Sequence, residues 1–284
     1  NILAEVDHPF IIKFVRAFVS KQCVHFLMEL VSGGELFAAL EELGLLGRSQ
    51  AQFYCGSLLL ALEYLHERRI AYLDLKSENC LIDHQGYLKL IDFGIARKII
   101  GPRSHVVKGT PMFMAPEMIL GKGYNTTADL WSLGVCLYEF MIGEFPFGNC
   151  PTNKEEELLL FRKILKAPLR FPPWFEKQPD SEDSLSLMRG LLTRDPAKRA
   201  GAGFAGYNNL KGHGFFSDFS FDALLSRGIV PPYLPQREVY AEDEAAASEP
   251  SAAAGDDDDG ALSDVTDFDD EEDLDSGWVK DFDC

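Results

Sequence analysis

The sequence predicts an α+β protein with β-strands near its N-terminus and mainly helices after them. Two runs rich in β-branched and aromatic residues, about 11–20 and 23–31, indicate strands near the N-terminus. Apolar residues at helical spacing in several later segments indicate helices. With 284 residues, of which 46% are hydrophobic, the chain can form a substantial core.

Turn-forming residues delimit the first elements. Residues 1–6 are expected to be the end of a helix, because Asp7-His8-Pro9 follows them. Ser32-Gly33-Gly34 interrupts the second β-rich run. We therefore expect a helix end followed by two strands.

The next region is predicted to combine a long helix with two short strands. Ser49 is a plausible N-cap for a helix that continues to about Arg69. Strands at about 80–83 and 87–91 follow it, joined by the turn His84-Gln85-Gly86.

The remainder of the folded region is predicted to be a loop followed by helices. The loop spans 92–125, and a strongly apolar helix then covers about 126–143 and ends at Gly143. Further helices are expected near 154–166 and 181–193.

Negative charge is concentrated near the C-terminus. Residues 238–284 contain 19 Asp and Glu and one Lys, which accounts for the formal net charge of −18. The remaining body is neutral, which argues against a nucleic acid partner, because such binding relies on basic side chains at phosphates. The low-complexity segment from Ala245 to Gly260 is expected to be disordered.

Cysteine spacing and hydropathy indicate the cellular environment. The six cysteines form no Cys-x-x-Cys pair, which is typical of reduced thiols in a cytoplasmic protein, with the nucleus as the alternative. No apolar run reaches the ~20 residues that span a bilayer, so no membrane segment is expected.

The densest group of polar residues lies between the long helix and the strand pair. It reads Tyr72-Leu73-Asp74-Leu75-Lys76-Ser77-Glu78-Asn79, and Asp92-Phe93-Gly94 and Ala115-Pro116-Glu117 follow it. Taken alone, the first segment could be a polar turn with a capping Asp. The order and spacing of all three segments resemble the signature of the protein kinase family. The resemblance covers residues 1–216 and implies a two-lobed fold, mostly its helical lobe, with 217–284 as a C-terminal tail.

The resemblance also implies ATP and Mg²⁺ as cofactors. Asp74 would accept the proton of the substrate hydroxyl, and Lys76 would reach the transferred phosphate. Asn79 and Asp92 would bind Mg²⁺, which prefers hard oxygen ligands. The nucleotide would be bound by residues at the end of the second predicted strand and just beyond it, with Leu81 beneath the base. The implied residues are Met28, Glu29, Val31, Glu35 and Leu81.

Several structural contacts follow from the same resemblance. Glu117 should form a buried ion pair with Arg199. Asp129 should form hydrogen bonds with the catalytic loop, the segment Tyr72–Asn79 that contains Asp74. For Asp129, a carboxylate in the first turn of its helix is the alternative interpretation. An apolar stack that links the lobes would consist of Leu3, Phe14, Tyr72 and Phe93, which could equally be ordinary core residues.

Further segments resemble the AGC group of kinases, in particular the cyclic-nucleotide-dependent kinases and above all the cGMP-dependent ones. These segments are Gly33-Gly34-Glu35-Leu36-Phe37, Gly123-Tyr124-Asn125 and Ser276-Gly277-Trp278-Val279-Lys280-Asp281-Phe282. The resemblance implies protein substrates with Arg before the phosphorylated Ser or Thr, and a cyclic-nucleotide-binding regulatory domain upstream. Carboxylates suit Arg, which binds them in a bidentate manner. The implied substrate-binding residues are Glu35, Glu78, Glu139, Val107, Thr110, Pro111 and Met114.

The sequence departs from the family pattern in four places, one of which is Met112, where the family has a Glu near the substrate. Leu73 stands where the family has Arg, and Val106 stands where it has a phosphorylated Thr, which suggests that an apolar contact replaces an ionic switch, with decay of the switch as the alternative. Ser77 replaces a usual Pro. No glycine-rich phosphate loop or partner lysine precedes the strands, so we expect an N-terminally truncated kinase with little activity of its own. The alternative is a non-catalytic scaffolding or binding protein.

Overall fold

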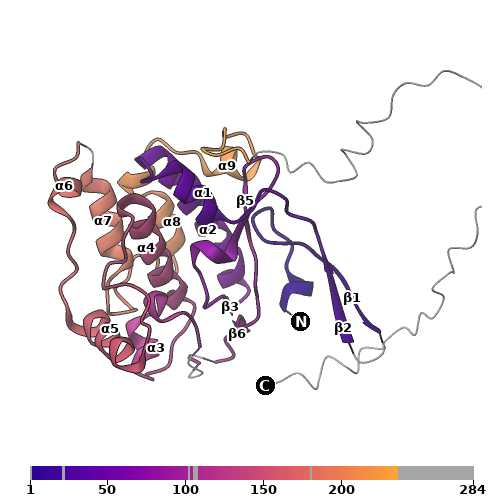
Figure 1. Ribbon diagram of the computed structural model, residues 1–284, viewed down its shortest axis with the longest axis horizontal. Helices are drawn as coiled ribbons and strands as arrows, with labels where there is room; N and C mark the ends of the chain where they lie inside the picture. The colour runs from indigo at the N-terminus through magenta and orange to yellow at the C-terminus, as the bar shows by residue number, and fades with distance from the viewer. Residues whose placement is uncertain (1, 21–22, 102, 105–107, 180, 236–284) are drawn as a thin grey trace, which may run out of the picture. The chain divides into compact units, whose positions relative to one another are not determined.

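The computed structural model describes residues 2–20, 23–101, 103–104, 108–179 and 181–235 (Figure 1). All of these belong to one unit, Ile2–Arg237. The predicted contacts of Val106 and Val107, and the predicted disorder from Ala245 to Gly260, lie outside the described residues.

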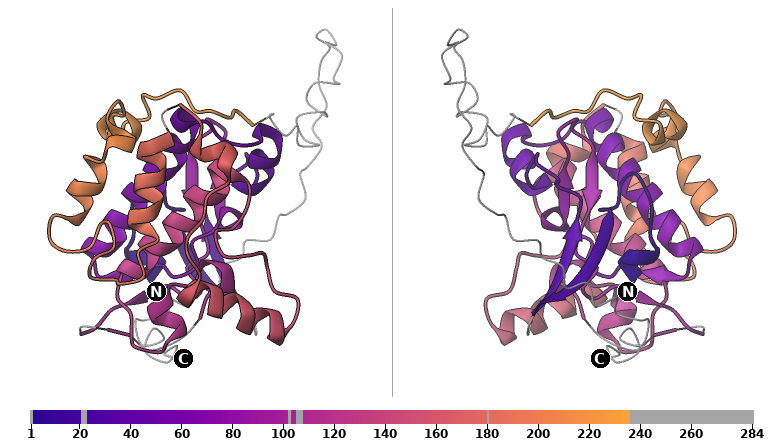
Figure 2. Two further views of the ribbon diagram at one scale, coloured as in Figure 1. Left: turned by 90° about the vertical axis from the view of Figure 1, so that its left-hand side faces the viewer. Right: turned by 90° about the vertical axis from the view of Figure 1, so that its right-hand side faces the viewer.

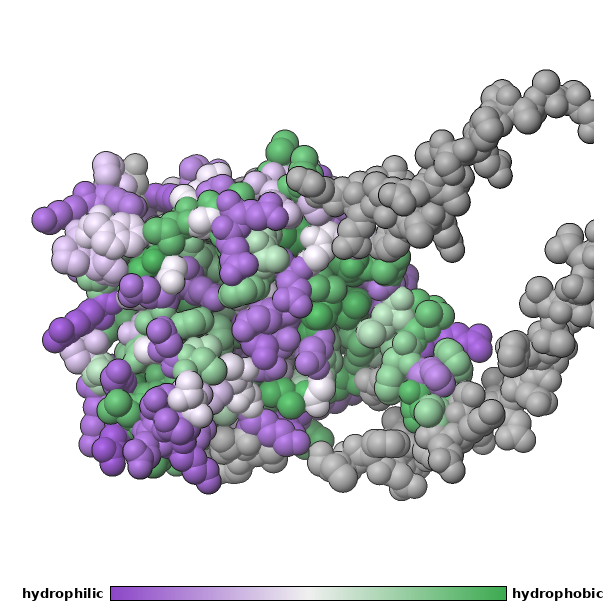
Figure 3. All heavy atoms as spheres, viewed as in Figure 1, coloured by the Kyte–Doolittle hydropathy of each residue, from purple (hydrophilic) through white to green (hydrophobic). Residues whose placement is uncertain are grey.

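The β-rich beginning forms a hairpin. Strands β1 (Phe14–Ser20) and β2 (Cys23–Met28) pair antiparallel, and in Figure 1 they extend away from the helices. Every residue of β2 is exposed, among them the hydrophobic Val24 and Phe26. Figure 3 shows hydrophobic side chains on the surface of the hairpin. The predicted helix end before the hairpin is a single 3-10 turn, η1 (Ile2–Glu5).

A second hairpin positions the polar segment. Strands β4 (Cys80–Ile82) and β5 (Leu88–Leu90) pair antiparallel, with Cys80 opposite Leu90, as the sequence predicts. The Leu90 N–H donates to the carbonyl of Phe10 at 2.8 Å, which attaches the N-terminal segment to this hairpin. Two shorter strands, β3 (Ile70–Ala71) and β6 (Arg97–Lys98), also pair antiparallel. In the sequence they lie just before and just after the region from Tyr72 to Gly94.

Two long buried helices form the centre of the core. Helix α2 (Arg48–Glu67) packs against α4 (Thr127–Ile142), and α4 packs in turn against α7 (Ser181–Leu191). Figure 2 shows this packing from two sides. The other helices are α1 (Leu36–Leu43), α3 (Pro116–Ile119), α5 (Lys154–Lys166), α6 (Pro173–Glu176), α8 (Gly206–Lys211) and α9 (Phe221–Leu225), with 3-10 turns η2 (Ser77–Asn79), η3 (Pro111–Phe113) and η4 (Gly214–Phe216). Among the described helices none is long and apolar enough to cross a bilayer.

The structure differs from the sequence predictions in further places. Ser49 lies inside α2, whose N-cap is Gly47, and the Gln50 side chain accepts the Gly47 N–H at 3.0 Å. The predicted loop over 92–125 contains β6, η3 and α3, because short elements leave little periodic signal. Helix α1 was not predicted, since the glycines before it suggested only a strand break.

The segment after α9 folds back onto the turn between β4 and β5. Arg227 forms an ion pair with Asp83 at 2.8 Å, and the Tyr87 hydroxyl donates to the carbonyl of Ile229. Gly86, in that turn, has a φ of 90°, and a Cβ there would lie 2.4 Å from the Tyr233 carbonyl. The turn and the returning segment therefore fit closely.

Candidate active site

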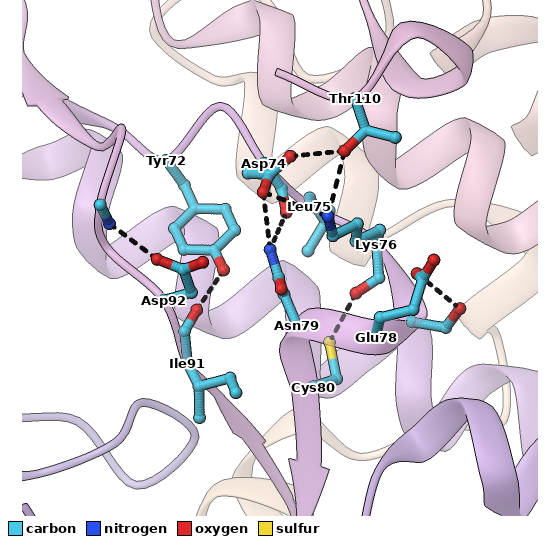
Figure 4. Close-up of polar contacts among 12 residues, drawn as sticks. Tyr72, Asp74, Leu75, Lys76, Glu78, Asn79, Cys80, Ile91, Asp92 and Thr110 are labelled. Atoms are coloured by element: carbon cyan, nitrogen blue, oxygen red, sulfur yellow. Dashed lines mark hydrogen bonds and ion pairs between the residues drawn. The ribbon is translucent and has the colours of Figure 1, made fainter. Parts of the chain in front are cut away.

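The β4–β5 hairpin brings two of the predicted site residues together. Asn79 precedes β4 and Asp92 follows β5, and the Ile91 N–H donates to the Asn79 carbonyl at 2.9 Å. Asp92 has a left-handed backbone, with a φ of 56°, and its Oδ1 accepts the Gly94 N–H at 2.9 Å. Both residues thus occupy the same end of the hairpin (Figure 4).

Asp74 lies at the centre of a hydrogen-bonded group (Figure 4). The Asn79 amide donates to the Asp74 carbonyl and to its Oδ2, each at 2.9 Å. The Thr110 hydroxyl donates to Asp74 Oδ1 at 2.9 Å, and Lys76 Nζ donates to the same hydroxyl at 3.1 Å. Lys76 Nζ also lies 3.4 Å from Asp74 Oδ2. The structure therefore brings a carboxylate, an ammonium group and a hydroxyl to one place.

Asp129 holds the backbone just before Asp74. Its Oδ2 accepts the Tyr72 N–H at 2.8 Å and its Oδ1 accepts the Leu73 N–H at 2.7 Å. The side chain of Asp129 is fully buried. Leu73 has a φ of 72°, an unfavourable backbone for a non-glycine residue, and the bonds to Asp129 help to hold it there. The predicted bond back to the catalytic loop is present.

Two further predicted contacts can be compared with the structure. Arg199 and Glu117 form a bidentate ion pair, at 2.7 and 2.8 Å, with exposed side-chain fractions of 0% and 6%. The rings of Tyr72 and Phe93 meet edge to face, 5.2 Å apart. Tyr72 also donates its hydroxyl to the Ile91 carbonyl, and burial raises its pKa.

Two of the predicted substrate-binding acids lie within hydrogen-bond distance of the same serine hydroxyl. The Ser77 hydroxyl lies 3.2 Å from Glu139 Oε1 and 3.3 Å from Glu78 Oε2. Burial, followed by the nearby charge of Glu78, raises the pKa of Glu139 to about 7, and the bond from Ser77 opposes this shift. Ser77 itself is fully buried, whereas Glu78 is exposed. The predicted third acid, Glu35, lies elsewhere, immediately before α1.

The predicted nucleotide residues follow the end of β2. Glu29 has a structural role that the sequence did not indicate, since its Oε1 accepts from the Lys13 N–H at 2.8 Å and from Lys89 Nζ at 2.7 Å. Glu35 forms a β-bridge with Leu81, so the chain after Val31 runs beside β4. Met28 is the last residue of β2, and Val31 packs against the core. Of the predicted nucleotide residues, Glu35 and Leu81 are therefore direct neighbours through their backbones.

The remaining predicted substrate contacts lie in and around η3. Pro111 is the first residue of this 3-10 turn, directly after Thr110. Met114 follows the turn and is buried. Val107 lies outside the described residues.

A magnesium ion is compatible with the donor set. The side-chain nitrogen of Asn79 donates to Asp74, which leaves the side-chain oxygen of Asn79 for a metal. Asp92 uses Oδ1 to accept the Gly94 N–H, which leaves Oδ2 as the second oxygen that could bind the metal. In the described part of the chain no three or more His, Cys, Asp or Glu form a metal site. Mg²⁺ usually takes only one or two protein ligands together with water and substrate phosphates, so this sparse set fits it.

A glycine pattern elsewhere does not form a phosphate-binding loop. Residues Gly201-Ala202-Gly203-Phe204-Ala205-Gly206 have the spacing G-x-G-x-x-G, but they precede the six-residue helix α8 and follow no described strand. A Cβ at Gly206 would lie 2.0 Å from the Gly201 carbonyl. Close backbone packing is therefore the reason for glycine there.

The fold and this site define a protein kinase. A model of the protein kinase domain family matches residues 1–216, and the chain belongs to this family. Among curated proteins, the chain is 56% identical over 243 residues to a cGMP-dependent protein kinase of Eimeria tenella, covering 86% of this chain and 23% of that protein. The corresponding enzyme of Plasmodium berghei (strain Anka) is 53% identical over 243 residues, covering 86% of this chain and 28% of the relative.

A more distant relative extends the comparison to the cAMP-dependent enzymes. The cAMP-dependent protein kinase type 3 of Saccharomyces cerevisiae is 41% identical over 235 residues, covering 83% of this chain and 56% of that protein. The predicted kinase fold and the predicted similarity to cyclic-nucleotide-dependent kinases are confirmed. The chain spans only about a quarter of the length of the cGMP-dependent relatives, at 23% and 28%.

Proposed function

We propose that this chain is the catalytic part of a Ser/Thr protein kinase that phosphorylates basic protein substrates. The observation that supports this most directly is the group formed by Asp74, Lys76 and Thr110, with Asn79 orienting the carboxylate. Phosphoryl transfer depends mainly on aligning the hydroxyl and neutralising charge, and this group provides both.

Each residue has a separate part in the reaction. Bound ATP would supply the phosphoryl group, with Mg²⁺ held by Asn79 and Asp92. Asp74 orients the substrate hydroxyl and accepts its proton. Lys76 places a positive charge beside that carboxylate, where it can neutralise phosphate oxygens. Asn79, through its two bonds to Asp74, keeps the carboxylate in one orientation.

The test compares two substitutions in a form of the protein that also carries a glycine-rich loop. Asp74→Asn should lower kcat by roughly 10²–10⁴-fold while nucleotide binding persists, because a general base is lost. Asp92→Asn should weaken nucleotide binding in the presence of Mg²⁺ but not in its absence. A protein that binds partners but incorporates no phosphate into any basic peptide would favour the scaffolding alternative.

We further propose that the substrates carry Arg before the acceptor residue. Glu78 and Glu139 face one hydroxyl and have no described cation between them, so a guanidinium group would relieve their repulsion. Glu139→Gln should raise KM for an Arg-containing peptide roughly 10-fold or more, as for loss of a charged hydrogen bond. Glu144→Gln, at an exposed acid after α4, is the matched control and should change little. Equal effects on an Arg-free peptide would contradict the assignment.

The regulation and location of the whole protein are also proposals. The relatives' names support control by a cyclic nucleotide through a domain outside these residues. A cytoplasmic location agrees with the scattered cysteines. Stimulation of a longer form by cGMP but not by cAMP would support the first proposal, and cell fractionation tests the second.

A further inference from the structure

Helix α8 contacts α2 through a tyrosine and a histidine. The Tyr207 hydroxyl lies 2.6 Å from His66 Nδ1, and the two rings meet edge to face at 5.7 Å. The residues are 141 positions apart in the sequence. Tyr207 is half-buried, and its hydroxyl faces the imidazole between the two helices.

The contact continues from His66 to the catalytic loop. His66 Nε2 lies 2.8 Å from Asp129 Oδ2, with exposed side-chain fractions of 6% for His66 and 0% for Asp129. Asp129 in turn accepts the N–H groups of Tyr72 and Leu73. A continuous line of hydrogen bonds therefore connects α8 with the peptide that precedes Asp74.

The chemistry of the groups sets the direction of these bonds. The Asp129 carboxylate already accepts two backbone N–H groups and can only accept from the imidazole, so His66 Nε2 carries the proton. In a neutral imidazole, Nδ1 is then an acceptor and requires a donor. Burial, followed by the charge of Asp129, raises the pKa of Tyr207, so its hydroxyl keeps its proton and can donate.

We propose that Tyr207 is a positioning residue for the catalytic loop. Its hydroxyl holds His66 in the tautomer that donates to Asp129, and Asp129 holds the left-handed peptide at Leu73 that directs Asp74 toward Thr110. The effect on catalysis rests on the proposed phosphotransfer function, but the effect on the catalytic-loop backbone does not.

The same pair of helices provides a matched control. Lys211 on α8 forms an ion pair with Glu63 on α2, at 2.8 and 2.9 Å. This contact also joins the two helices, yet no described hydrogen bond leads from Glu63 to Asp129. Tyr207→Phe and Lys211→Met therefore each remove one polar contact between α8 and α2, and only the first interrupts the line to the loop.

The experiment measures hydrogen exchange and the ¹⁵N spectrum of the His66 ring in the 284-residue chain. Tyr207→Phe should speed exchange of the Tyr72 and Leu73 amides by roughly three- to tenfold, the range expected for one hydrogen bond. The ring nitrogens should also lose the pattern of a single Nε2–H tautomer. Lys211→Met should leave both readouts unchanged, and thermal unfolding of each variant checks that it is folded.

Several results would overturn the proposal. Unchanged exchange at Tyr72 and Leu73 in folded Tyr207→Phe, or equal acceleration in Lys211→Met, would show that α8 acts only as general support. An unchanged tautomer in Tyr207→Phe would show that Asp129 alone orients His66. In an active form of the protein, Tyr207→Phe should lower kcat with little change in KM. An absence of kinase activity before substitution would contradict the proposed function but leave the exchange result valid.

Discussion

The environment of Glu139 changes the pH at which its side chain ionises. It is mostly buried, faces the charge of Glu78 and receives one bond from Ser77, and its pKa is raised to about 7. A guanidinium group needs the ionised form of this carboxylate. The residue thus connects pH to the proposed recognition of arginine.

We expect arginine preference to rise with pH. The ratio of kcat/KM for an Arg-containing peptide to that for its Arg-to-Ala counterpart should increase between about pH 6 and pH 8, because Glu139 ionises near pH 7. Glu139→Gln should flatten this profile, and a steep rise that persists in the variant would assign it to another group. Measurement requires only initial rates with the two peptides.

The same shift affects stability in the opposite direction. Because the folded state raises the pKa from 4.5 to about 7, it binds the proton more tightly than the unfolded chain between these values. The contribution of Glu139 to the free energy of unfolding therefore decreases as pH rises from about 4.5 to about 7.

Residue roles could be predicted from the sequence where they belong to a compact motif. Asp74, Lys76 and Asn79 lie within six positions of one another, and the structure brings them together through local turns. The contact between Tyr207 and His66 could not be predicted, because no local pattern relates residues 141 positions apart. The substitution at Ser77 was visible, but its position between two carboxylates required the structure.

At the scale of elements, the helices with clear end signals were predicted best. Helix α5 begins after Asn153, whose side chain accepts the Glu156 N–H at 3.0 Å, and α4 ends at Gly143, which has a φ of 78°. Strand β2 ends earlier than predicted, at Met28, because the chain turns to pair with β4, where the Gly33 N–H donates to the Ile82 carbonyl. Such tertiary pairing leaves no periodic signal.

The ion pair between Glu117 and Arg199 joins α3 to the segment after α7. Breaking a buried pair leaves an uncompensated charge, so Arg199→Met should lower the free energy of unfolding by about 3–5 kcal/mol. The double variant with Glu117→Leu should lose less than the sum of the single variants. Denaturant titration measures both, and additive losses would show that the two side chains act independently. Lys198→Met, at an exposed neighbouring residue, is the control.

At the scale of the folded unit, stability should be unevenly distributed. The β1–β2 hairpin exposes every residue of β2, whereas most residues of α2 and α4 are buried. A two-stranded hairpin alone is only marginally stable. Among these four elements, we therefore expect hydrogen exchange to be fastest in β1 and β2 and slowest in α2 and α4. Equal protection of both regions would mean that the chain unfolds only as a whole.

The segment that folds back after α9 has a consequence for where this protein can be cut. The family match ends at residue 216, yet Arg227 and Ile229 are bonded to the turn that carries Asp83 and Tyr87. A chain shortened to residue 216 would expose that turn and the apolar surface beside it. We expect such a chain to melt at a lower temperature and to aggregate, whereas one ending at residue 237 should remain soluble. The region recognised by sequence similarity is thus expected to be shorter than the region that must be kept for a stable, soluble protein.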